Sequence, residues 1–305
     1  SALRGSVGVT VHRVRGDHRG VAEYRFEGGL RVIAKMYADR AKGQAVHAIQ
    51  SAVWENGFDS GSRYRVPESI GYVPEHGIML MHAAPGESLR DVPLANWDRF
   101  KEGVLEAARW LAALHRWPHA AGPVAEAADD FSRLQRLERD AAACRPDEAD
   151  RFRAALDELG RRYDSIGTSS ARVQTHGRYH IDHVFLSSEC VTVVDLDRAA
   201  ISEAARDVGE FLHRLRWEVA RMRLGKPAMH QATEEFLTEY ARHTDDGLSG
   251  LLYHWSGSIL SALLASACRP RPAGRHGNKR LRHLTKEFER VPRHIEALFE
   301  RPKRT

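Results

Sequence analysis

The first 36 residues alternate apolar and polar positions in three short runs. The runs are VGVTVHRV, VAEYRFE and LRVIAKMY, separated by a polar turn (RGDHRG) and by a Gly28-Gly29 turn. A period of two is typical of half-buried strands, and short glycine-containing turns join antiparallel neighbours. We therefore predict three antiparallel strands between Val7 and Met36.

A helical spacing follows in residues 40–56, with Gly57 as the expected stop. The apolar side chains that share one face are Ala45, Val46, Ile49, Ala52 and Val53. From Pro67 to Met81 the chain returns to strand character, with a turn at PEHG between two runs. These features predict a small N-terminal lobe, residues 1–84, made of an antiparallel sheet and one helix.

From residue 85 onward the pattern is mainly helical. Residues 97–116 carry a continuous apolar stripe, and residues 130–163 form a second helical region rich in Arg and Glu. Almost all of residues 205–299 have a helical pattern. The sequence thus predicts an α+β protein with a larger helical lobe, residues 85–305.

The composition is that of an ordinary globular protein. Of the 305 residues, 42% are hydrophobic and 29% charged, and no apolar run approaches the ~20 residues that span a bilayer. The start, SALRGSVGV, lacks the apolar core of a signal peptide. The three cysteines, Cys144, Cys190 and Cys268, have no metal-ligand spacing. We expect reduced thiols, no disulfide framework, no membrane partner and a cytoplasmic location.

The net charge of +5 comes from an uneven distribution of basic residues. Lys and Arg are concentrated in RPRPAGRHGNKRLRHLTK after residue 268 and in RPKRT at the end. One interpretation is nucleic-acid binding, and the other is a solvated basic surface or a sleeve for a phosphorylated ligand. We favour the second, because no aromatic-interleaved stripe accompanies the charges.

The candidate chemistry lies in a loop, residues 175–185 (THGRYHIDHVF), and in a segment after a strand, residues 193–198 (VVDLDR). Lys35 stands at the end of the third expected strand. A lysine there is usually a solvated edge residue. The order of features around Lys35 is what favours a functional interpretation. That order is strand lysine, helix, strand and small-residue turn, long helix ending LAALHR, His-Gly loop, strand and aspartate.

In this order of motifs the chain resembles the aminoglycoside phosphotransferase and choline kinase-like family, whose fold is that of protein kinases. IMLMHAAPGESL is similar to the family's strand, hinge and entry into the second lobe, and ARWLAALHR to its Leu-x-x-Leu-His helix. His176-Gly177, His180 and Asp195-Leu-Asp197 match the family's His-Gly-Asp-x-His-x-x-Asn loop and its metal-binding aspartate. Asp207 matches a later structural aspartate.

The resemblance implies ATP or GTP as phosphoryl donor and Mg²⁺ as cofactor. Lys35 is implied to pair with the α- and β-phosphates, and Asp195 to chelate the metal ion. Backbone groups from Met81 to Ala84 are implied to hold the adenine, and the turn from Gly16 to Gly20 to cover the phosphates. The residues expected to bind nucleotide are thus Lys35, Met81, His82, Ala83, Gly16 and Gly20.

The loop departs from the family at two chemical positions. Arg178 stands where the family has its catalytic aspartate, and a guanidinium cannot act as a base at physiological pH. His183 stands where the family has a metal-binding asparagine, and its nitrogen is a softer donor than Mg²⁺ prefers. Asp182 and Asp197 are nearby carboxylates able to substitute. The expected catalytic residues are Asp195, Arg178, Asp182 and His180, and the expected metal ligands are Asp195, His183 and Asp197.

Other positions keep more than one interpretation. His176, His180 and His183 together invite a transition-metal site, although His176 is more simply a loop-bonding structural residue. The carboxylate that pairs with Lys35 in the family has no clear counterpart, with Gln44 near its place and Glu55 at the helix end. Trp255 and Tyr253 are expected core residues, with an acceptor pocket as their alternative role.

Two functions follow. The first is a phosphotransferase that acts on a hydroxyl of a small molecule, an antibiotic, sugar or metabolite. The alternative is a pseudokinase, a nucleotide- or metabolite-binding module that regulates a protein partner. Lys35 and Asp195 favour the enzyme, whereas Arg178 and His183 favour the module.

Overall fold

The computed structural model describes residues 7–15, 19–92, 96–164, 171–221, 225–245, 248–269 and 276–299. The chain forms two compact units, each built from two stretches of sequence. The first contains residues 1–123 and 176–201, and the second residues 124–175 and 202–305. These units group residues by packing, and the lobe boundary expected at residue 84 stays a prediction.

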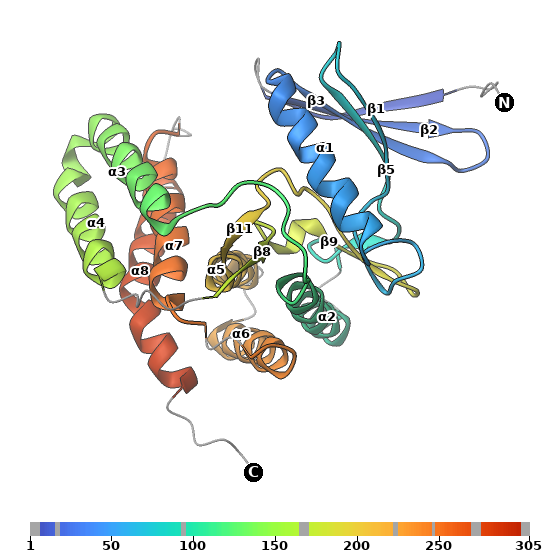
Figure 1. Ribbon diagram of the computed structural model, residues 1–305. Helices are drawn as coiled ribbons and strands as arrows, with labels where there is room; N and C mark the ends of the chain where they lie inside the picture. Colours follow the sequence, from blue (N-terminus) through green and yellow to red (C-terminus); the bar gives the residue numbers. More distant parts are fainter. Residues whose placement is uncertain are drawn as a thin grey trace. The chain divides into compact units, whose positions relative to one another are not determined.

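The first unit contains a five-stranded sheet of order β1-β2-β3-β6-β5, in which every pair of neighbours is antiparallel (Figure 1). Its strands are β1 (Val7–Arg15), β2 (Arg19–Phe26), β3 (Arg31–Tyr37), β5 (Ser69–Val73) and β6 (Ile78–His82). The three N-terminal strands and the later pair are confirmed. Val21, Lys35 and Met79 are paired across neighbouring strands, so their side chains lie on one face of the sheet.

Helix α1 (Arg40–Glu55) packs against this sheet and confirms the predicted helix. Asp39 caps its N-terminus by accepting a hydrogen bond from the backbone N–H of Lys42. The apolar stripe of α1 meets the sheet in a core cluster of Tyr37, Val46, Met79 and Met81, with Ile33 and Tyr72 packed against it. The core therefore fixes the face of β3 that carries Lys35.

A second sheet of the first unit has the order β4-β10-β9-β7. Its strands are β4 (Tyr64–Arg65), β7 (Glu87–Ser88), β9 (Val184–Leu186) and β10 (Val191–Val193). Strands β9 and β10 form an antiparallel hairpin, with the short 3-10 helix η2 (Ile181–His183) directly before it. Helix α2 (Trp97–His115) buries its apolar stripe, including the fully buried Trp110. Both candidate segments, 175–185 and 193–198, thus flank this hairpin.

The second unit is mainly helical. It contains α3 (Ala127–Cys144), η1 (Pro146–Glu148), α4 (Ala149–Asp164), β8 (Arg172–Thr175), β11 (Ala200–Glu203), which starts at the end of the first unit, α5 (Ala204–Arg221), α6 (Gly225–Arg242), α7 (Leu251–Ala267) and α8 (His276–Phe299). Helix α7 is apolar on most of its surface because α3, α4, α5 and α8 all pack against it. Of the basic stretch 269–286, residues 270–275 lie outside the described residues, and residues 276–286 form the first part of α8.

The expectation of reduced thiols is wrong for two of the three cysteines. Cys144 at the end of α3 and Cys268 after α7 form a disulfide, with their Cα atoms 5.3 Å apart. They are separated by 124 positions in sequence, and helix packing brings them together. Disulfides are uncommon in reducing compartments, so the cysteines no longer support the expected cytoplasmic location. Cys190 is a buried free thiol.

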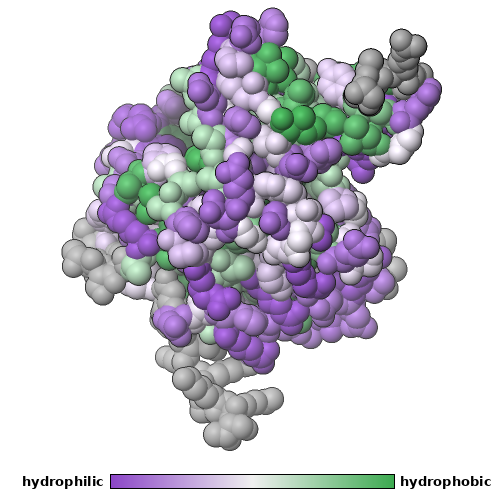
Figure 2. Space-filling model, turned by 45° about the vertical axis from the view of Figure 1, so that its right-hand side comes forward, coloured by the Kyte–Doolittle hydropathy of each residue, from purple (hydrophilic) through white to green (hydrophobic). Residues whose placement is uncertain are grey.

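Some large apolar side chains of the described residues are exposed. Val7, Val9 and Val11 of edge strand β1 are between 42% and 61% exposed. Apolar surface, green in Figure 2, lies toward the top of the view, where the sheet of the first unit is drawn. Among the helices that the structure describes, none is long and apolar enough to cross a membrane.

Candidate active site

The centre of the site is built by the chain that leaves β10. Asp195 and Asp197 flank Leu196, whose side chain is buried and anchors the segment. Asp195 has φ = 74°, in the left-handed region that few non-glycine residues adopt. A strained backbone of this kind costs on the order of 1 kcal/mol and is frequent at functional sites. The turn directs the Asp195 carboxylate toward β3.

Lys35 binds both aspartates. Its Nζ lies 2.5 Å from Asp195 Oδ1 and 2.7 Å from Asp197 Oδ1. The Tyr37 hydroxyl also donates to Asp197 Oδ1, at 2.9 Å. The three charged side chains are only 6–13% exposed, so water screens them poorly. We call Lys35, Asp195 and Asp197 the lysine–aspartate cluster, and its formal charge is one negative.

The loop before η2 is held by three anchors. His176 is fully buried, and its Nε2 lies 3.0 Å from the carbonyl oxygen of Val194. At Gly177, which has φ = +75°, a Cβ atom would lie 1.9 Å from the Arg198 carbonyl oxygen, so only glycine fits. The Tyr179 hydroxyl donates to the Ala107 carbonyl on α2, at 2.8 Å. These contacts agree with the structural role expected for His176.

His183 faces the cluster from the end of η2. Its Nδ1 lies 3.1 Å from the Arg178 carbonyl oxygen, which can only accept, so Nδ1 carries the proton. Its Nε2 lies 3.3 Å from Asp195 Oδ2. Burial, helped by the neighbouring His180 and His176, holds the pKa of His183 well below its usual value. The ring is therefore neutral at physiological pH.

Asp182 is the one carboxylate of the loop 175–185, and its side chain is more exposed than those of Asp195 and Asp197. Arg90 Nη1 donates to its Oδ2 at 2.8 Å, and His180 Nδ1 lies 3.6 Å from its Oδ1. Burial raises the pKa of Asp182, but the interactions with His180 and Arg90 outweigh it and leave the pKa below its usual value. Asp182 is thus ionised at neutral pH, and 38% of its side chain is exposed.

The loop arginine contributes through its backbone, because the Arg178 carbonyl orients His183. The sequence offered no clear helix partner for Lys35, and the structure pairs it with the two aspartates. Buried Gln50 on α1 instead donates to the Pro67 carbonyl and contacts the sulfur of Met81. Sequence reasoning missed Tyr37, although its position two residues after Lys35 places it on the same strand face.

The other expected nucleotide-binding residues have mixed placements. Met81 is buried in the core of the first unit. The N–H of His82 donates to the Glu68 carbonyl and that of Ala83 to the Arg31 carbonyl, so these two donors are already used. Gly16 lies outside the described residues. Gly20 is not in a turn as expected: it pairs with Met36 inside β2, which begins at Arg19.

The structure does not form the three-histidine metal site. The ring centroids of His176 and His183 are 5.4 Å apart and those of His180 and His183 3.7 Å apart. The first pair is stacked, so its nitrogens do not converge. Throughout the described part of the chain, no group of three or more His, Cys, Asp or Glu side chains could hold a metal ion by itself.

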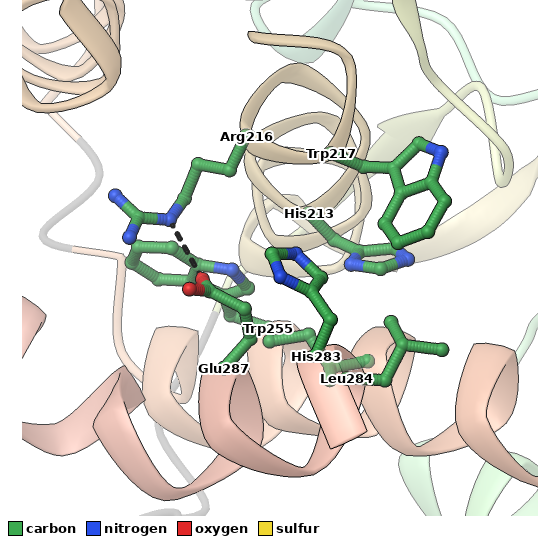
Figure 3. Close-up of a pocket in the computed structure, with 8 residues that line it drawn as sticks. His213, Arg216, Trp217, Trp255, His283, Leu284 and Glu287 are labelled. Carbon is green, nitrogen blue, oxygen red and sulfur yellow. Dashed lines mark hydrogen bonds and ion pairs between the residues drawn. The ribbon is translucent and has the colours of Figure 1, made fainter. Parts of the chain in front are cut away.

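The second unit holds a small cavity of about 10 Å³ between α5, α7 and α8. Figure 3 shows Arg216 bonded to Glu287 beside the indole of Trp255, with Nε 3.3 Å from Oε2. The volume suits about one water molecule and no substrate. Tyr253 is also buried, and its hydroxyl donates to the Ala127 carbonyl. Trp255 and Tyr253 are therefore core residues.

Two features of the site are typical of a kinase-like protein. A strand lysine is bonded to an aspartate that follows a β-hairpin, and a His-Gly loop anchored on a helix lies beside them. Comparison with family models gives the more specific assignment. Residues 13–244 match the phosphotransferase enzyme family, and the chain belongs to that family.

Solved structures support the kinase-like fold. The chain is similar to amicoumacin kinase hAmiN, with a TM-score of 0.66, 14% identity, and 92% of this chain and 87% of that chain covered. A choline/ethanolamine kinase family protein from Mesorhizobium loti gives a TM-score of 0.63 at 13% identity, covering 98% and 94%. Aminoglycoside-3'-phosphotransferase of type VIII gives 0.57 at 18% identity, covering 82% and 92%. No curated protein matches in sequence.

Proposed function

We propose that the protein transfers the γ-phosphoryl group of ATP or GTP to a hydroxyl group of a small molecule. The observation that carries the proposal is one buried cluster of Lys35, Asp195 and Asp197. Lys35 lies 160 positions before Asp195 and 162 before Asp197 in the sequence. Phosphoryl transfer depends mainly on positioning and charge neutralisation, and such a cluster supplies both a cation and metal-binding oxygens.

Lys35 is the group proposed to bind the nucleotide phosphates. It is buried, held by the sheet and aimed at the two aspartates. An ammonium in this position offsets the repulsion between phosphates. The two aspartates provide its counter-charge, which keeps the extended lysine in place.

Asp195 and His183 are the residues proposed to hold a divalent ion. Asp195 Oδ2 and His183 Nε2 lie 3.3 Å apart, and nucleotide-dependent enzymes often bind their metal through one or two side chains together with phosphate oxygens. The two donors fit such a site, which needs no cage of three protein ligands. The bound ion would neutralise charge on the departing phosphoryl group.

Asp182 is proposed to orient the acceptor hydroxyl and accept its proton. It is ionised and accessible, and Arg90 and His180 position it. Arg178 cannot serve as this base. A general base contributes roughly 10²–10⁴-fold to rate, so a shifted carboxylate with a lowered pKa gives a slower but functioning enzyme. We propose Arg178 as a contact for transferring phosphate charge or for a phosphorylated acceptor.

The acceptor class is proposed by analogy. The similar structures include an amicoumacin kinase, choline and ethanolamine kinases and a macrolide 2'-phosphotransferase. We propose an antibiotic or a small hydroxylated metabolite on this basis.

The second candidate is a pseudokinase that binds nucleotide or metabolite and regulates a protein partner. One observation favours it: Arg178 stands at the position where the family has its catalytic aspartate, and a guanidinium cannot act as a base. A binding module needs the lysine–aspartate cluster and no base at Arg178.

A thermal-shift titration with ATP, with and without divalent ion, tests the proposal. Ligand at about 100 times its Kd stabilises the native state by about 2.7 kcal/mol, which raises the Tm by several degrees. We expect such a shift for the wild type and none for Asp195→Asn with ATP and metal. Asp157→Asn, an exposed aspartate on α4, is the matched control.

Turnover then separates the two candidates. A phosphotransferase shows acceptor-dependent ADP or GDP release that disappears in Asp195→Asn, whereas a pseudokinase shows the thermal shift without turnover. Absence of any shift at millimolar nucleotide would contradict the phosphotransferase and the nucleotide-binding form of the second candidate.

A further inference from the structure

The two oxygens of Asp195 face different partners. Oδ1 accepts from Lys35 Nζ at 2.5 Å, whereas Oδ2 faces His183 Nε2 at 3.3 Å. Asp197 differs, because its Oδ1 accepts from both Lys35 and Tyr37. Among these carboxylate oxygens, Oδ2 of Asp195 is therefore the one placed to bind a metal ion together with the imidazole of His183.

The imidazole is oriented as a metal ligand would be. Its Nδ1 lies against the Arg178 carbonyl, so Nε2 is the ring nitrogen that faces Asp195 Oδ2. A ligating histidine almost always donates its other N–H to a carbonyl, carboxylate or water, which fixes the ring. Here the carbonyl belongs to the residue that replaces the family's catalytic aspartate.

The donor spacing also fits. Two ligands at about 2.0–2.2 Å from one ion, at octahedral to tetrahedral angles, lie roughly 2.8–3.6 Å apart. The observed separation between Nε2 and Oδ2 is 3.3 Å. His183 is 11% and Asp195 13% exposed, so the ion would be largely shielded from bulk water.

We propose that His183 and Asp195 select a transition-metal ion, of the Mn²⁺ and Co²⁺ class, over Mg²⁺ as the metal of the bound nucleotide. The inference rests on the proposed nucleotide-dependent function and goes beyond it by naming the class of metal. Mg²⁺ requires hard oxygen ligands, whereas imidazole suits softer first-row ions. His183 thus replaces an oxygen ligand with one that changes which ion binds best.

Calorimetric titration of a non-hydrolysable ATP analogue, in Mg²⁺, Mn²⁺ or Co²⁺, tests the preference. For the wild type we expect a Kd at least about tenfold lower with Mn²⁺ or Co²⁺ than with Mg²⁺. In His183→Asn, which restores an oxygen donor, that ratio should fall by about tenfold. His76→Asn, in the exposed turn before β6, should keep the wild-type ratio. His183→Gln, with folding checked by circular dichroism, provides a second oxygen-donor variant.

Pulsed electron paramagnetic resonance on the complex with Mn²⁺ and the analogue distinguishes direct ligation from a merely structural histidine. We expect a nitrogen coupling from a bound imidazole in the wild type and its loss in His183→Asn. A metal ratio that does not depend on His183, or absence of the nitrogen coupling, overturns this inference and leaves the proposed function standing. Failure to bind the analogue with any ion overturns both.

Discussion

Each unit of the molecule contains buried, paired charges, and the two sets differ in their balance of charge and in their surroundings. In the second unit Arg216 and Glu287 form one cation with one anion, 3% and 9% exposed, with the guanidinium over the Trp255 ring. In the first unit one lysine serves two carboxylates, one of them on a strained backbone, with a neutral histidine alongside. The balanced pair of Arg216 and Glu287 is suited to a structural role in the core. The lysine with two carboxylates is suited to ligand binding, because the lysine can contact a phosphate and a carboxylate can contact a cation.

The largest expected effect is on catalysis. Asp195→Asn should reduce kcat/KM by at least about 10³-fold, because it removes the proposed metal ligand beside Lys35. Asn tolerates the left-handed backbone, and Asp197 still pairs with Lys35, so the Tm should change little. Steady-state kinetics and a thermal melt together check this prediction. Near-normal turnover of this variant would contradict the proposed role of Asp195 in catalysis.

The opposite pattern is expected in the second unit. Glu287→Ala removes the carboxylate that pairs with buried Arg216 and should lower the free energy of unfolding by about 3–5 kcal/mol. Turnover per folded molecule should not change. Denaturant unfolding measures the loss, and the double variant Arg216→Met with Glu287→Leu should restore most of the stability. A loss of turnover without loss of stability would show that the comparison between the pairs is wrong.

A smaller catalytic effect should follow at the loop. Asp182→Asn should lower kcat about a hundredfold with little change in KM for nucleotide, since only the group that accepts the hydroxyl proton is lost. Arg90→Ala, which removes the ion-pair partner but leaves the carboxylate, serves as comparison. If both variants raise the KM for the acceptor and leave kcat unchanged, Asp182 binds the acceptor and is not the base.

The smallest effect concerns stability at low pH. The Glu23 carboxylate is buried among Arg31, Arg25 and His12, and hydrogen bonding to Arg31 is the main cause that lowers its pKa from 4.5 to about 2. A lowered carboxyl pKa adds stability above 4.5, and this is lost as pH falls toward 2. Chemical denaturation should show the wild type losing about 1–3 kcal/mol more than Glu23→Gln over that window. If the free energy of unfolding depends on pH in the same way in both proteins, Glu23 does not contribute to the loss of stability at low pH.

The sequence predicted the strands, α1, α2 and the helical remainder well, because each has strong periodicity or a clear stop signal. It also placed Lys35 and Asp195 in one site, through the order of motifs. It could not predict that Lys35 bonds Asp197 as well, since that depends on the left-handed turn at Asp195. Strand β4 has two residues, too few for any periodicity.

Two other errors arose from packing between distant segments. The disulfide between Cys144 and Cys268 depends on how the ends of α3 and α7 meet, which no cysteine spacing reveals. Arg90 lies in a turn without periodicity, and its contact with Asp182 appears only when the loop is folded.

The most direct test of the lysine–aspartate cluster is equilibrium binding of an ATP analogue, with divalent ion, to the wild type and to Lys35→Met. Methionine keeps much of the side-chain volume and removes the charge, and Lys42→Met on the exposed side of α1 is the matched control. The account predicts binding by the wild type and the control, weakened at least about tenfold in Lys35→Met. Equal affinity in all three proteins would contradict it.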